Sequence, residues 1–229
     1  MKRLISAIGL ACVAGGAVLA HDPNGVPISW NREVSRIVYE RCASCHREGG
    51  TSFSLMTYQE AQPHASAMKD AVLARRMPPW GAVKGFGSFE NDEGLTQQQI
   101  ELIADWVEGG ITKGNNPKAL PPLPKFEPPA RFSLPKDALV ITDGLTLTQS
   151  VTVAGVYPQH VPQATSMQIV ASLPGGDVEP LIWLYQFKDG YRHPFLFRKP
   201  VELPPRTVIR GVVPGATIFL ITERKTTRK

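Results

Sequence analysis

The stretch RCASCHR, residues 41–47, decides how the first half of this 229-residue chain folds. Its pattern, CxxCH, is typical of c-type haem attachment, in which two thiols bond the porphyrin and the adjacent imidazole binds the iron. The alternatives are a redox dithiol, half of a zinc site and a chance occurrence of the pattern. The chain has no second CxxC or HxxxH to complete a zinc site, and the residues upstream are helical in pattern rather than βαβ. We therefore expect Cys42 and Cys45 to carry one covalent haem c, with His46 as the proximal iron ligand.

Helical periodicity surrounds this motif. Apolar residues at helical spacing run through residues 31–41 into Cys42, and a second helical segment is expected over residues 57–76, with Pro63 as a kink or a first-turn residue. A further helix is predicted to begin at Thr96, which forms a capping box with Gln99, and to stop at the Gly-Gly pair that follows residue 108. The first half of the chain is therefore expected to be a small all-α domain.

Met77 is the predicted distal iron ligand. It ends the second helical segment and precedes two prolines, which push its backbone out of the helical region and stiffen the loop. A neutral thioether in that position favours the ferrous state. Three other residues compete for this role. Met68 is assigned to the core, Met56 to packing against the haem, and His64 to a solvated helix position. Trp80 and Trp106 are expected to pack on the haem edge.

Two runs carry a resemblance to a known family: CASCHREGGTSFSLMTYQEA and RRMPPWGAVKGFGSFENDEGLTQQQIELIADWVEGG. They resemble the class I cytochrome c domain found beside bacterial copper type II, ascorbate-dependent monooxygenase-like modules. The resemblance covers roughly residues 30–125, with the haem motif, MPPW, the FxND run and the final WVxxG helix in order. It implies a haem with His46 and Met77 as ligands. Such domains usually have a proline near position 52, which helps to orient the proximal imidazole, and this chain has Ser52 there.

The second half of the chain is β-rich. Apolar and polar residues alternate over residues 145–153 and 167–173, and further strands are expected over residues 179–187, 207–213 and 216–222. Seven or so short strands suggest an antiparallel β-sandwich. A run with seven prolines favours an extended linker before it. The predicted fold class is α+β and multidomain, in this order: signal peptide 1–20, monohaem cytochrome c domain 21–114, proline-rich linker 115–135 and β-sandwich 136–229.

The sandwich sequence resembles, more faintly, the C-terminal copper domain of the same monooxygenases. The matching runs are YPQHVPQATSMQIVASLPGGDVEPLIWLYQF and PVELPPRTVIRG. That family has a His-x-His pair and a later Met ligand, whereas here only His160 stands in the pair region and no Met follows Met167. His193 is the remaining candidate partner of His160, and two imidazoles without a third ligand make a poor copper site. The resemblance therefore implies a monooxygenase-like fold without its metal, kept for docking or for shielding the haem.

The N-terminus and the charge distribution indicate the compartment and the partners. A short basic start, an apolar run over residues 4–19 and a cleavage site after Ala20 predict a signal peptide, with an uncleaved anchor as the alternative. We expect a periplasmic or secreted protein with no stable membrane insertion after cleavage. The net charge is +5, with ten Lys/Arg against twelve Asp/Glu in residues 21–118 and thirteen against eight in residues 119–229. Without a Lys/Arg stripe interleaved with aromatic residues, nucleic acid is not expected as a partner.

These features favour a one-electron carrier over a catalyst. The expected partners are redox proteins, with a copper monooxygenase-like protein as one candidate. The alternatives are a haem or copper oxidoreductase, related to peroxidases or monooxygenases, and a scaffold subunit of a redox complex. A haem peroxidase usually places a distal His or Glu as acid and base near an open site, and the MPPW loop offers neither.

Overall fold

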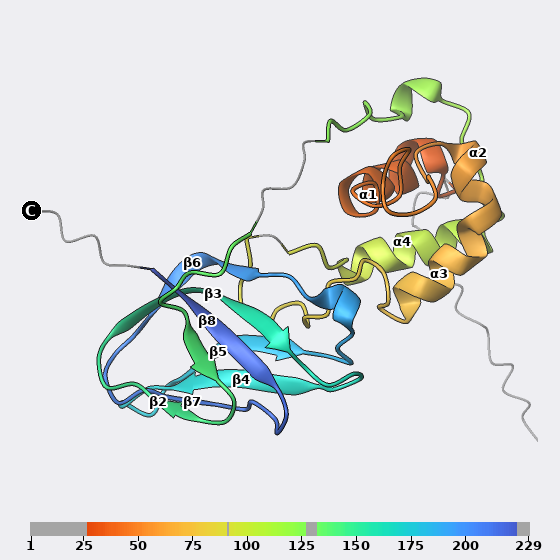
Figure 1. The fold of residues 1–229 in the computed structure, drawn as a ribbon. Coiled ribbons are helices and arrows are strands. Elements are labelled where there is room, and N and C mark those ends of the chain that lie inside the picture. Colours follow the sequence, from red (N-terminus) through yellow and green to blue (C-terminus); the bar gives the residue numbers. More distant parts are fainter. Residues whose placement is uncertain (1–26, 91, 127–131, 224–229) are drawn as a thin grey trace, which may run out of the picture.

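The chain forms a small helical part and two antiparallel sheets of four strands each (Figure 1). This computed structural model describes residues 27–90, 92–126 and 132–223. The predicted signal peptide, residues 1–20, lies outside the described residues. Within the described part, none of the helices is both long and apolar enough to cross a membrane. The mixed α+β class with a sandwich-like β part is as the sequence predicts.

The helical part consists of short elements. In chain order they are η1 (Trp30–Val34), α1 (Ser35–Arg41), α2 (Tyr58–Ala61), η2 (Gln62–His64), α3 (Ala65–Leu73), α4 (Gln97–Glu108) and η3 (Pro117–Ala119). The segment α2–η2–α3 is the kinked helix predicted from the sequence, because Pro63 lies in the first turn of η2, where a proline costs no helical hydrogen bond. The predicted capping box of α4 is also present: the Gln99 amide donates to the Thr96 hydroxyl at 3.1 Å.

The helices pack around two tryptophans. Trp30 and Trp106 lie with ring centroids 6.0 Å apart, and the indole N–H of Trp106 donates to the carbonyl of Thr112 at 2.9 Å. Both indoles are almost fully buried, together with Met68 from α3. Burying side chains of this size contributes roughly 1.5–3 kcal/mol each. Trp106, assigned to haem packing by the sequence, therefore holds η1 against α4 in the helical core.

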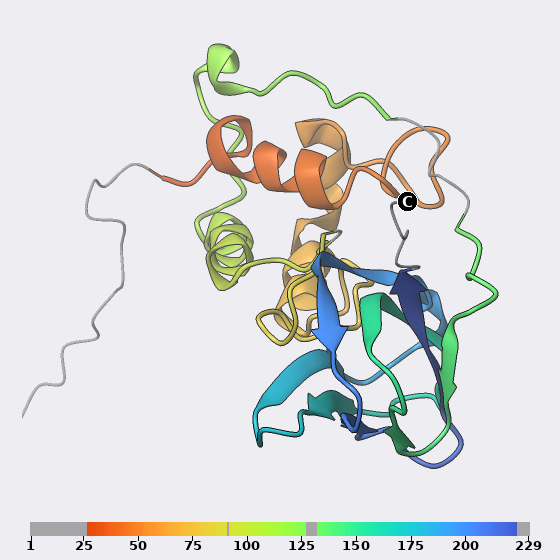
Figure 2. The same ribbon diagram turned by 90° about the vertical axis from the view of Figure 1, so that its left-hand side faces the viewer.

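The strands form two stacked sheets with the orders β1-β8-β3-β6 and β2-β7-β4-β5 (Figure 2). They are β1 (Leu139–Ile141), β2 (Leu145–Thr146), β3 (Val151–His160), β4 (Met167–Ser172), β5 (Val178–Leu184), β6 (Phe195–Leu203), β7 (Val208–Arg210) and β8 (Thr217–Glu223), with the short helix η4 (Asp189–Tyr191) before β6. Alternating side chains of each strand face the space between the sheets, as in β4, where Met167, Ile169 and Ala171 are buried. Of these strands, β1 and β6 were not predicted from the sequence.

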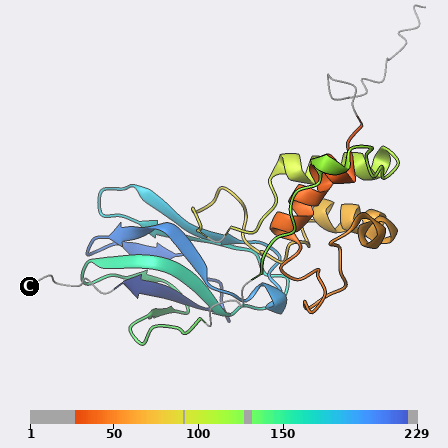
Figure 3. The same cartoon turned by 90° about the horizontal axis from the view of Figure 1, so that it is seen from above.

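Residues 78–90, here called the bridging segment, connect the helices to the sandwich and pack on it (yellow in Figure 1; the two parts lie side by side in Figure 3). The backbone bonds between them run from Val83 N to Trp183 O, from Tyr185 N to Gly81 O, from Glu90 N to Leu196 O and from Arg198 N to Ser88 O, at 2.8–3.0 Å. Trp80 and Phe89 are buried among the core residues of the sandwich. The bridging segment falls within the range assigned to the helical domain, yet it completes the sandwich core.

Candidate functional site

The CxxCH motif forms a tight turn at the end of α1. Cys42 is the C-cap residue of α1, and its amide donates to the carbonyl of Val38 at 2.9 Å. The Cys42 carbonyl in turn accepts from the amides of Cys45 and His46, at 3.1 and 2.9 Å. Both cysteines are free thiols. The helix end therefore brings the two predicted attachment thiols and the predicted proximal imidazole into a single turn.

A backbone carbonyl holds the His46 ring. The Nδ1 atom of His46 lies 3.0 Å from the carbonyl oxygen of Phe53, and the amide of Leu55 donates to the His46 carbonyl at 3.1 Å. With its proton on Nδ1, the ring donates to Phe53 and keeps the lone pair of Nε2 for a metal. The sequence left open what orients this imidazole at the place where the domains it resembles have a proline. The carbonyl of Phe53 supplies that contact.

Burial raises the pKa of the Cys42 thiol to about 12, and the neighbouring Cys45 adds to the increase while Arg41 opposes it. The Arg41 side chain connects the end of α1 to residue 92, because its Nη1 donates to the carbonyl of Asp92 at 2.6 Å. Its Nε is buried without a hydrogen-bond partner among the described residues. A buried donor without an acceptor is costly, so an acceptor that reached this Nε would be stabilised, while the Nη2 of the same guanidinium already pairs with Glu40 at 3.0 Å.

Of the three methionines in the helical part, Met77 alone is well exposed. Its exposed fraction is 44%, whereas Met68 is 9% exposed and Met56 packs against the same core. Met77 follows α3, where Arg75 adopts a positive φ of 52° and turns the chain away from the helix axis. The remaining candidate ligand, His64, stacks on the Phe53 ring at a centroid distance of 4.1 Å.

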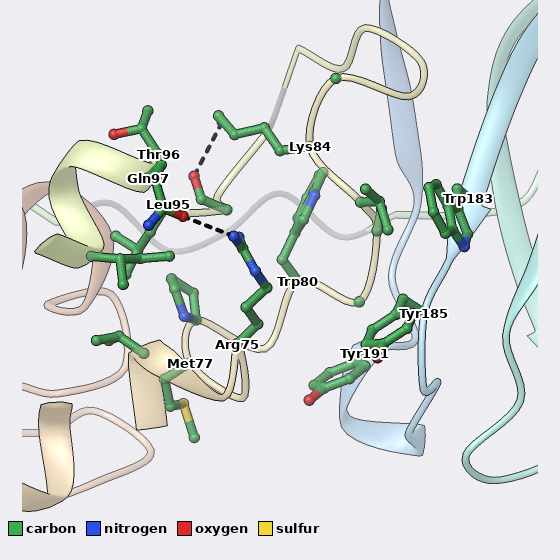
Figure 4. A pocket seen from close by; sticks show the side chains of 18 residues that line it. Arg75, Met77, Trp80, Lys84, Leu95, Thr96, Gln97, Trp183, Tyr185 and Tyr191 are labelled. Atoms are coloured by element: carbon green, nitrogen blue, oxygen red, sulfur yellow. Dashed lines mark hydrogen bonds between the residues drawn. The ribbon is translucent and has the colours of Figure 1, made fainter. Parts of the chain in front are cut away.

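A cavity of about 600 Å³ lies between the helices and the sandwich (Figure 4). It is lined by the ends of α3 and α4, the first half of the bridging segment, and aromatic residues that include Trp183, Tyr185 and Tyr191. On its helical side Arg75 donates to the Gln97 amide oxygen at 3.1 Å. Met77 lies on the helical side of the cavity, across from Tyr185 and Tyr191 in Figure 4. Cys42, Cys45 and His46 are not part of the lining.

The two predicted copper candidates occupy different surroundings. His160 is exposed at the end of β3. The ring of His193 lies between Trp80 and Phe195, at centroid distances of 4.9 and 4.2 Å, and its nitrogens are 3.3 Å from the Trp80 carbonyl oxygen and 3.1 Å from that of Pro194. In the part of the chain that the structure describes, no group of three or more His, Cys, Asp or Glu side chains is placed to hold a metal ion.

Trp80 is the residue whose surroundings differ most from those expected from the sequence. The sequence assigns Trp80 to the haem edge, whereas the structure buries its ring to 3% exposure against Phe89 and Phe195. Its indole N–H has no hydrogen-bond partner among the described residues. The contact with His193 joins positions 113 residues apart, and nothing in the local sequence of either residue signals it.

The donor set at the CxxCH turn fits a covalently held haem. Two free thiols, an imidazole with one nitrogen hydrogen-bonded and the other available, and a buried cationic donor lie around one helix end. No protein-family model, curated protein or solved structure matches this chain. The interpretation of the site therefore rests on its own residues and geometry.

Proposed function

We propose that this protein is an exported monohaem c-type cytochrome that carries one electron at a time, with the β-sandwich as its docking domain. The contact between His46 and the Phe53 carbonyl is the observation that carries the proposal. With the ring proton on Nδ1, this contact leaves the lone pair of Nε2 for the iron, which is the arrangement that an iron-binding histidine needs. A solvated surface histidine after a CxxC pair has no need of that contact.

The proposed roles of the residues follow from their positions. Cys42 and Cys45 form the thioether bonds to haem c, His46 is the proximal ligand and Met77 is the distal one. The haem supplies a ferrous/ferric couple, and the neutral sulfur ligand favours the ferrous form. The exposure of Met77 supports this assignment, since its thioether is the one in the helical part that the core does not use. Arg41 would suit a haem propionate through its Nε, which is buried and has no partner among the described residues, although its Nη2 already pairs with Glu40 at 3.0 Å.

Docking to a partner is assigned to the sandwich half. Residues 119–229 carry thirteen Lys/Arg against eight Asp/Glu, so this half is basic and attracts an acidic redox protein. A copper monooxygenase-like protein is the candidate partner that the sequence resemblance implies. The predicted signal peptide would export this protein to the periplasm or out of the cell, so a partner would have to be exported as well.

The test is the optical spectrum of the purified protein, ferric and ferrous, with carbon monoxide added to the ferrous form. The proposal expects a covalent, low-spin haem that does not bind carbon monoxide in the wild type, and a haem that binds it readily in Met77→Ala. His64→Ala is the matched control and is expected to behave as the wild type, because the His64 ring is stacked on Phe53.

Each alternative gives a distinct result. A chain that carries no covalent haem when produced with the haem-attachment machinery contradicts the proposal outright. Carbon monoxide binding by the wild type favours the enzyme interpretation, in which the distal position is open. Closure of the iron by His64 instead of Met77 appears as carbon monoxide binding in His64→Ala only.

A further inference from the structure

We propose that His193, a residue of the sandwich half, is a positioning residue for the distal-ligand loop, residues 77–80. The sandwich thereby holds Met77 in place for the iron, in addition to any docking role. This inference rests on the proposed function in one respect, namely that Met77 binds the haem iron. The contact itself involves residues of this chain alone, so it can be measured without the haem.

His193 binds the loop at its last residue. Its Nε2 lies 3.3 Å from the carbonyl oxygen of Trp80, and with a proton there the ring donates a hydrogen bond to it. The same ring packs against the Trp80 indole at 4.9 Å, at an angle of 30°. The ring of Phe195 also packs against the His193 ring, with the two centroids 4.2 Å apart. His193 therefore fixes both the backbone and the side chain of Trp80.

The residues after Trp80 are fixed by the sandwich as well. Gly81 accepts a hydrogen bond from the amide of Tyr185, and the amide of Val83 donates to the carbonyl of Trp183. Gly81 adopts a positive φ of 73°, and a Cβ at this position would lie 2.7 Å from the ring of Tyr191. The backbone must therefore pass the sandwich closely at this point, and a side chain would push it away.

Only two prolines separate this fixed point from Met77. Pro78 and Pro79 each have φ locked near about −65°, so the loop has few conformations once Trp80 is held. The Trp80 amide also donates to the Pro78 carbonyl at 2.8 Å, which closes a short turn. Fixing Trp80 from the sandwich therefore limits where the Met77 backbone can lie. Without that restraint, the thioether has to be ordered anew each time it binds the iron, which weakens it as a ligand.

The decisive variant is His193→Phe in the full-length holoprotein, which keeps an aromatic ring and removes the donor. We expect the Met-to-iron charge-transfer band of the ferric spectrum to weaken and carbon monoxide to bind the ferrous form about fivefold faster, the factor that the loss of one buried hydrogen bond supplies. His193→Gln, which retains an N–H donor, is expected to restore part of the wild-type behaviour. Ile209→Val, a conservative change in the sandwich core, is the control and is expected to leave both readouts unchanged.

Hydrogen exchange of the haem-free protein provides an independent readout. In His193→Phe the amides of Val83 and Tyr185 are expected to exchange about fivefold faster, because their bonds join the bridging segment to the sandwich. Unchanged exchange together with an unchanged haem spectrum overturns the inference. A wild type without haem, combined with faster exchange in the variant, overturns the proposed function and leaves the contact standing. Faster exchange with an unchanged ligand band shows a merely structural contact and also overturns the positioning role.

Discussion

At the scale of single residues, Cys42 is the side chain whose chemistry the fold changes most. Its pKa is raised from 9.0 to about 12, mainly by burial. Because only the thiolate reacts, alkylation of Cys42 in the haem-free protein is expected to be slow at pH 7 and to rise about tenfold per pH unit until about pH 12. In denaturant the rate should level off near pH 9. Mass spectrometry after timed iodoacetamide treatment measures both profiles, and coinciding profiles would show that the folded chain does not protect this thiol.

The same thiol links folding to pH. The folded haem-free protein keeps the Cys42 proton between about pH 9 and pH 12 while the unfolded chain has lost it, so the free energy of unfolding falls as the pH rises through this window. Tyr39 and Tyr191 also have raised pKa values and add to the slope. Urea unfolding of the wild type and of Cys42→Ala at several pH values measures how the free energy of unfolding depends on pH in each. The difference between the two slopes is the contribution of Cys42. An identical slope in the two proteins would contradict the assignment.

At the scale of secondary-structure elements, the capping box of α4 carries the clearest prediction. Thr96 and Gln99 each bond the other's backbone amide, at 3.1 and 2.9 Å. Thr96→Ala removes the acceptor for the Gln99 amide and is expected to lower the free energy of unfolding by about 1 kcal/mol. Thr96→Ser keeps the hydroxyl and should therefore retain most of this stabilisation. The midpoints of urea unfolding test this, and equal midpoints for the alanine and serine variants would argue against the cap.

The elements that were predictable are those with local signals. The cap at Thr96 and the kink at Pro63 depend on residues within one helical turn, and the sequence alone sufficed for both. Strand β6 was missed because its middle, with Arg198, Lys199 and Pro200 in succession, interrupts the apolar alternation. Its pairing with β3 gives it a place in the sheet, and the β3 partners lie 39 (Val156↔Phe195) to 52 (Val151↔Leu203) positions away in the sequence. Tertiary contacts thus decide where the local pattern is weak.

At the scale of the whole molecule, sequence patterning predicted the two kinds of structure and not the way in which they are joined. The CxxCH turn is a local motif, so its residues were found directly. The bridging segment looks like a loop in sequence because its glycines and aromatic residues show no period. Its contacts with Trp183, Leu196 and His193 exist only after the sandwich has formed. The role of Trp80 was therefore beyond the reach of spacing arguments.

The two parts of the molecule are accordingly expected to stay together when the linker is cut. A protease site inserted after Leu123, which is 65% exposed, allows cleavage in the folded protein. The fragments should elute as one species in gel filtration, because Trp80 and Phe89 remain buried in the sandwich core and the backbone bonds of the bridging segment persist. Removing a buried tryptophan costs about 3–5 kcal/mol, so the cleaved Trp80→Ala protein should separate into two species. Separation of the cleaved wild type would instead mean that the linker alone connects the helical part to the sandwich.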